Sequence, residues 1–400
     1  LVESISTSIA GEGSNETNQA NTSSTSSTRS TPVAAPHSAL TSRYFNSRHV
    51  VCLRVLVNTA ISLKSTLQDS WNIIWIALQW CGYYLDGPDQ FSPYFNNTKV
   101  QQTLKESKKP QISAQDVTNV ENSIKKLYVS IGDGSVETFR TILITLTRLS
   151  DFALDVDNEK YEDELPISSF NKSYFVSRLA QVSEIDDFHN WLIKDEESWD
   201  IISSYFIDLG TKRNIHFSLR NYVVEMYMKV IETVAVFGFQ HDDLIEETSQ
   251  KTLNGLNGYL EKLFGMGSSK ELLINNRETE IHLLILTTLH TLIDKYDKNY
   301  QQTWNEVFKL LNTPFRTVKK DEVEETINND DTRSDEGVLL KDKTQLLVEK
   351  SFDTLKLILD EFLSTLPFNQ FKLLIDTLSN FVYQQYDLNI SFSSVSYFWL

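Results

Sequence analysis

A spacing of apolar residues at every third or fourth position runs through most of the chain and constrains its fold more than any other feature. It is clearest between residues 348 and 382, where Pro367 separates two apolar series. The first series is Val348, Phe352, Leu355, Leu359 and Phe362, and the second is Phe371, Leu374, Ile375, Leu378 and Val382. Such spacing places each series on one face of an α-helix, so both series are predicted to face a core.

The two helices around Pro367 are predicted to form a helical hairpin. Pro367 ends the first helix and Asn369 is predicted to cap the second. The short connection requires the two helices to be antiparallel. A hairpin with one apolar face cannot bury that face alone and needs similar hairpins stacked on it. The pattern therefore predicts an all-α, HEAT/armadillo-like α-solenoid.

Comparable apolar series precede this hairpin and predict about six degenerate hairpins in total. Helices are expected to start near residues 47, 116, 171, 216, 278 and 343, with uneven spacing. Gly132, Asp133 and Gly134 form a predicted turn within the second hairpin, and Pro314 is predicted to end the fifth. The α-solenoid is expected to cover residues 39–400 without any β-sheet, because no alternating pattern persists for more than a few residues.

Two segments lack an apolar pattern. Residues 1–38 are rich in Ser, Thr and Asn and are expected to be a disordered linker, because ordering them would bury little apolar surface. Residues 316–340 carry an acidic run and are expected to form a flexible loop. The chain starts without Met and stops within a helical pattern at Leu400, which we expect of an internal fragment of a longer protein.

Composition excludes several classes of function. The formal net charge of −17 disfavours nucleic acid and anionic membrane surfaces, which both require clusters of Lys and Arg. No apolar run reaches the ~20 residues that span a bilayer, so no transmembrane segment is predicted. The chain has 2 cysteines, Cys52 and Cys81, each within an apolar helical pattern. Both are predicted to be buried free thiols in a reducing compartment.

The sequence carries no strong catalytic signature, which favours a non-enzyme. The sequence contains no H-E-x-x-H, phosphate-binding loop, C-x-x-C or G-x-S-x-G motif. His241, Asp242, Asp243, Glu246 and Glu247 could be drawn as a metal site, but acidic residues also favour the first turn of a helix. The helix start is the preferred interpretation, and no catalytic, cofactor-binding or metal-binding residue and no cofactor is predicted.

Other aromatic and histidine residues are interpreted structurally. Trp71, Trp75 and Trp80 could form a ligand cage, but their helical spacing favours packing in the core. His282 and His290 lie eight positions apart on one predicted helix and are interpreted as residues at its polar edge.

Two patches of the sequence resemble a known family. One patch is Leu388, Asn389, Ile390 and Ser391 followed by Phe398, Trp399 and Leu400; the other is residues 52–58 with Trp71 downstream. Both resemble the monensin-sensitivity family of large Golgi and endosome scaffolds, which are related to the large Sec7-type Arf exchange factors but lack the Sec7 domain. The resemblance covers residues from about 40 to 400.

The resemblance implies a role in vesicle-mediated protein transport between the trans-Golgi and endosomes. It implies a cytoplasmic, peripheral membrane scaffold whose membrane association is indirect or comes through the rest of the parent chain. The partners implied are a Dopey-type protein, an aminophospholipid flippase and an Arf-like GTPase. Two alternatives stay open: part of an Arf-family guanine-nucleotide exchange factor, and an acidic HEAT-repeat nuclear transport receptor.

Overall fold

The computed structural model describes residues 46–85, 112–155, 166–212, 214–265, 276–296, 300, 303–316 and 334–399. Every regular element in these ranges is a helix, which confirms the predicted all-α class. The expected disorder of residues 1–38 lies outside these ranges. The chain divides into two compact units, Leu1–Arg178 and Leu179–Leu400, and the boundary falls inside one helix. A single solenoid across residues 39–400 stays a prediction.

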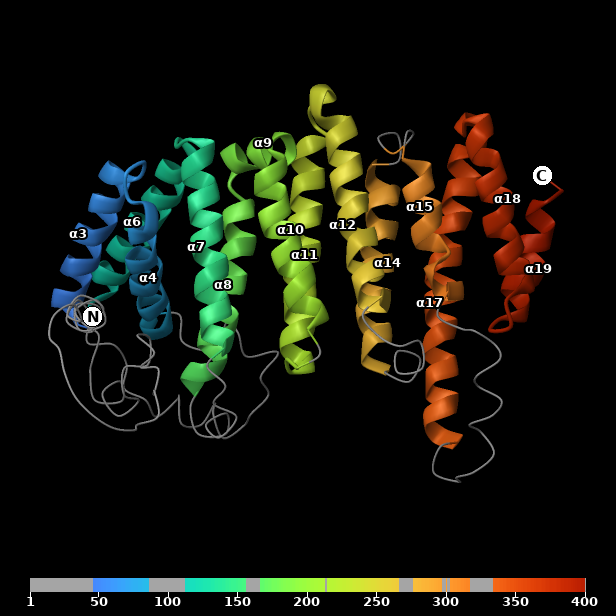
Figure 1. Ribbon diagram of the computed structural model, residues 1–400, viewed down its shortest axis with the longest axis horizontal. Coiled ribbons are helices and arrows are strands. Elements are labelled where there is room, and N and C mark those ends of the chain that lie inside the picture. Colours follow the sequence, from blue (N-terminus) through green and yellow to red (C-terminus); the bar gives the residue numbers. More distant parts are fainter. Residues whose placement is uncertain are drawn as a thin grey trace, which may run out of the picture. The chain divides into compact units, whose positions relative to one another are not determined.

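The first unit stacks one helical hairpin on another (Figure 1). Its helices are α3 (Ser47–Leu63), η1 (Gln68–Ser70), α4 (Trp71–Leu85), α6 (Ala114–Gly132), α7 (Val136–Asp155) and the first part of α8 (Pro166–Ser183). Helix α3 packs against α4 and α6, and α4 packs against α7. Each helix of the first hairpin therefore lies on the corresponding helix of the second, which is the packing of a solenoid.

Local signals in the sequence fix the helix ends of this unit. Asn46 caps α3, where its side chain accepts hydrogen bonds from the backbone N–H groups of Arg48 and His49. Ser113 caps α6 in the same way through the N–H of Asp116. The predicted turn is confirmed, because α6 ends at Gly132 and the N–H of Gly134 donates to the carbonyl of Ile131 at 2.9 Å.

The second unit contains the rest of α8 and the remaining helices. These are α9 (Asp186–Lys194), α10 (Glu196–Thr211), α11 (Phe217–Gly238), η4 (Asp242–Leu244), α12 (Ile245–Gly265), α14 (Asn276–Tyr296), α15 (Trp304–Leu311), α16 (Thr313–Arg316), α17 (Ser334–Phe362), η6 (Leu363–Thr365), α18 (Phe368–Tyr383) and α19 (Leu388–Tyr397). The helices occur in the predicted order, with α9 as an addition.

The second unit has two layers of stacked helices. Helices α11, α14 and α17 pack in sequence in one layer, and α10, α12, α15 and α18 pack in sequence in the other. Each helix therefore contacts the helix that occupies the same place in the next hairpin, as a solenoid requires. The first apolar series is buried as predicted, with Val348 and Leu355 at 0% exposure and Leu359 at 6%.

Two glycines allow close approach between helices in this unit. A Cβ atom at Gly210 of α10 would collide with the hydroxyl of Tyr259 on α12. A Cβ atom at Gly238 of α11 would collide with the side chain of Thr248, also on α12. Both positions therefore favour glycine, because a side chain of α12 fills the space that a Cβ atom would take.

The exact helix limits differ from the sequence prediction at several places. Helix α9 was not predicted, because nine residues give too short a periodic signal. Helix α17 begins at Ser334, inside the loop expected for residues 316–340. Pro314 does not end the fifth hairpin, because α15 already ends at Leu311 and Pro314 lies in the short helix α16.

The face that α18 buries is the main correction. Leu374 and Leu378 are buried as predicted, but Phe371 and Ile375 are 39% and 40% exposed, and Val382 is only half-buried. Phe381 takes the core position, with its ring centroid 4.8 Å from Phe315 and 5.4 Å from Phe352. Helix α18 is apolar on two sides, and the spacing alone cannot show which side is buried.

The predicted cap of α18 is also wrong. Pro367 occupies the N-cap position with an extended backbone and makes no side-chain cap, and Asn369 lies inside the helix. Proline fits this position because its fixed φ angle suits an extended residue that precedes a helix. Asp69 and Ser70 lie in η1, which leads directly into α4.

Substitution Leu359→Ala tests the assignment of the α17 core. Leu359 is 6% exposed, so the change leaves a cavity, and we expect a loss of about 2 to 5 kcal/mol in unfolding free energy. The control is Ile375→Ala on α18, which is 40% exposed and should change stability by about 0.5 kcal/mol or less. Denaturant unfolding measures both, and equal losses would contradict the assignment.

Candidate functional site

The acidic residues around His241 lie at the start of a helix, as the sequence predicted. Asp242 and Asp243 lie in η4, and Glu246 and Glu247 form the first turn of α12. The Asp243 carboxylate accepts a hydrogen bond from Lys194 Nζ at 3.1 Å, which lowers the pKa of Asp243. In the part of the chain that the structure describes, no group of three His, Cys, Asp or Glu side chains could hold a metal ion. The predicted absence of catalytic, cofactor-binding and metal-binding residues stays a prediction.

The interpretation of His282 as a polar-edge residue is wrong. His282 is 1% exposed, and its Nε2 atom lies 2.7 Å from the hydroxyl of Thr313 on α16. Burial lowers the pKa of His282 to about 3, so its imidazole is neutral at physiological pH. His290 is part-buried, as expected of an edge residue, and its Nδ1 atom lies 3.0 Å from the hydroxyl of Thr354 on α17. Both histidines join α14 to neighbouring helices.

The tryptophans and cysteines follow the predictions in part. Trp71 and Trp75 are fully buried and stack on each other, with ring centroids 6.3 Å apart, so they belong to the core. The side chain of Trp80 lies outside the described part of the structure.

Cys81 is a buried free thiol as predicted, but Cys52 is exposed. Cys52 is exposed because α3 buries Leu53 and Val57 on its other face.

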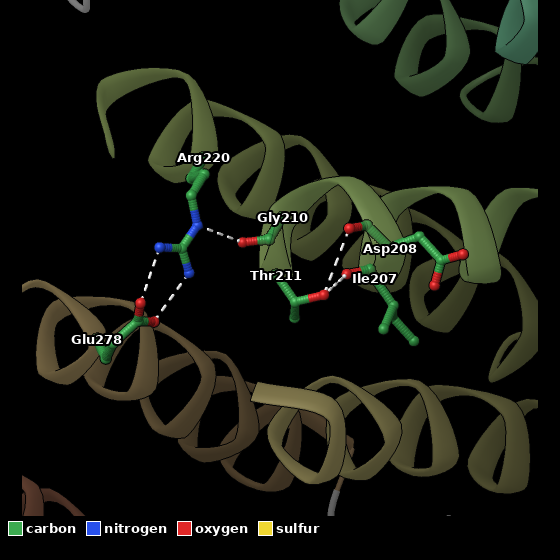
Figure 2. Close-up of polar contacts among 6 residues, drawn as sticks. All are labelled: Ile207, Asp208, Gly210, Thr211, Arg220 and Glu278. Atoms are coloured by element: carbon green, nitrogen blue, oxygen red, sulfur yellow. Dashed lines mark hydrogen bonds and ion pairs between the residues drawn. The ribbon is translucent and has the colours of Figure 1, made fainter. Parts of the chain in front are cut away.

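A buried ion pair joins three helices of the second unit (Figure 2). The guanidinium of Arg220 on α11 donates to both carboxylate oxygens of Glu278 on α14, at 2.7 and 2.9 Å. Its Nε atom donates to the carbonyl of Gly210 on α10 at 2.8 Å. Arg220 and Glu278 are 4% and 6% exposed, so each depends on the other for its compensating charge.

The positions of these groups along their helices explain the arrangement. Gly210 lies in the last turn of α10, where backbone carbonyls have no partner within the helix and a cation is favourable. Glu278 lies in the first turn of α14, where a carboxylate is favourable. The ion pair therefore complements one helix C-terminus and one helix N-terminus while it fixes the spacing between α10, α11 and α14.

The sequence analysis missed this pair. Arg220 lies between Leu219 and Tyr222 in an apolar run. That position was the only sign in the sequence that its charge is buried. Glu278 is 58 positions away, and nothing in the sequence joins the two residues. Only the stacking of α11 on α14 brings them together.

Three aromatic rings from α10, α11 and α12 form a buried stack in the second unit. Tyr227 of α11 stacks between Phe206 and Tyr259, with centroid distances of 5.5 and 6.3 Å. The hydroxyl of Tyr227 lies 2.7 Å from that of Ser203. Burial raises the pKa of Tyr227 and of Tyr259, so neither phenol ionises at physiological pH. The three rings are part of the core of the second unit.

Surface side chains also join successive helices. Lys262 on α12 pairs with Asp208 on α10, and Lys309 on α15 pairs with Glu261 on α12. Lys343 on α17 pairs with Glu280 on α14 at 2.8 Å. Exposed pairs of this kind contribute little to stability, but they show which helices are neighbours.

Lys251 of α12 joins two further helices through their backbones. Its Nζ atom donates to the carbonyl of Leu192 in α9 at 3.2 Å and to the carbonyl of Asp195 at 3.4 Å. Burial lowers the pKa of Lys251, and the charge of Glu196 opposes that shift. The polar groups described here therefore join neighbouring helices.

Packing of this kind defines the fold class: each unit is built as an α-solenoid of the HEAT/armadillo type. No family model and no solved structure matches the chain. Protein MON2 of Saccharomyces cerevisiae (strain ATCC 204508 / S288c) is 29% identical over 389 residues, which are 90% of this chain and 23% of that protein. The match supports the resemblance to the monensin-sensitivity family, and the chain spans under a quarter of that relative.

Within the described ranges, no helix is both long and apolar enough to cross a membrane.

Removal of one member of the buried ion pair should destabilise the second unit strongly. Glu278→Ala leaves Arg220 buried without its carboxylate, and we expect a loss of about 3 to 5 kcal/mol in unfolding free energy. The double variant Arg220→Met, Glu278→Leu should lose less, because no buried charge remains. Lys262→Met is the control at an exposed pair, with an expected loss of about 0 to 1 kcal/mol. A larger loss in the double variant than in Glu278→Ala would contradict this account.

Burial of neutral His282 should make stability depend on pH. Its pKa is about 3 in the folded protein and 6.5 when unperturbed, so the unfolded chain binds the extra proton between these values. Below its unfolded pKa, wild type should therefore lose about 1.4 kcal/mol per pH unit more than His282→Gln. Urea unfolding at several pH values from about 5 to 8, the range in which histidine titrates, measures the change in unfolding free energy with pH. Parallel stability curves for the two proteins below neutral pH would show that His282 is not buried in its neutral form.

Proposed function

We propose that this chain is part of a non-enzymatic protein-interaction scaffold that acts in vesicle-mediated protein transport between the trans-Golgi and endosomes. The similarity to Protein MON2 over 90% of the chain is the observation that carries the proposal. The scaffold would be cytoplasmic and peripheral to the membranes of the trans-Golgi network and endosomes. Its membrane association would be indirect or come through other parts of the same protein.

The geometry is consistent with a scaffold. Stacked hairpins present long rows of outward side chains on a rigid support, which suits the binding of other proteins. Three buried ionisable side chains join helices to one another: Arg220 and Glu278 neutralise each other, and His282 bonds to Thr313. A net charge of −17 further favours partners that carry basic surfaces.

The resemblance to the family suggests the partners. They are a Dopey-type protein, an aminophospholipid flippase and an Arf-like GTPase. We assign no contact with any of them to particular residues, because no short motif in this chain encodes such a contact.

A cross-linking pull-down of the intact natural protein from its own cells tests this proposal. We expect trans-Golgi and endosome trafficking proteins among the captured partners and a punctate distribution that overlaps trans-Golgi markers. Recovery of basic nuclear cargo with a nuclear distribution would instead indicate a transport receptor. Accelerated nucleotide release from an Arf-family GTPase, measured with the purified protein, would indicate an exchange factor.

A pair of matched variants on α17 tests whether the second unit takes part. Leu359→Asp places a charge in the core of the unit, whereas Lys356→Asp places the same charge at an exposed position of the same helix. We expect the first variant to lose captured partners and the second to retain them, with protein levels matched by titrated expression. Equal capture by both variants would show that the second unit is dispensable for binding.

A further inference from the structure

We draw no further inference here: the strongest candidate, the surface patch on α3 of the first unit that carries the exposed side chains of Val51, Arg54 and Val55, carries nothing because nothing in the structure shows what covers it.

Discussion

The burial of each hairpin between two neighbours is the constraint on which the second unit depends. Helix α15 has only 8 residues, and a helix of that length is not stable alone in water. It forms because its apolar side chains, including Trp304 and Phe308, are covered by helices on both sides. Stability in such a stack comes from the interfaces between hairpins, so damage to one hairpin weakens its neighbours.

Polar contacts then select one register from many that apolar packing would allow. The Arg220–Glu278 pair can form only when α10, α11 and α14 meet at the observed positions. Gly210 and Gly238 add a steric condition, because a Cβ atom at either position would collide with a side chain of α12. These contacts therefore fix how α10, α11, α12 and α14 meet.

The sequence predicts the class of fold and much of the core, but not the polar centre. Spacing located Leu359, Trp71 and Trp75 correctly, because burial of apolar residues on a helix leaves a strong periodic signal. It failed for Phe371 and Ile375, since α18 is apolar on two sides. It also failed for His282 and Arg220, whose burial depends on partners from helices distant in the sequence.

Functional residues could not be predicted for a related reason. A scaffold binds through surfaces assembled from several hairpins, and such surfaces have no local motif comparable to a catalytic signature. Similarity over most of the chain therefore supports the function. The structure adds which side chains face outward, because the stacking of the helices determines this.

Zero-length carbodiimide cross-linking, read by mass spectrometry, tests the stacking order most directly. It joins Lys to carboxylates that are in contact, and the stack predicts links between Lys262 and Asp208, Lys309 and Glu261, and Lys343 and Glu280. Each link joins a helix to its neighbour in the same layer. Recovery of these three links would support the two-layer solenoid. Their absence, with the same lysines linked instead to carboxylates of helices that the stack keeps apart, would contradict it.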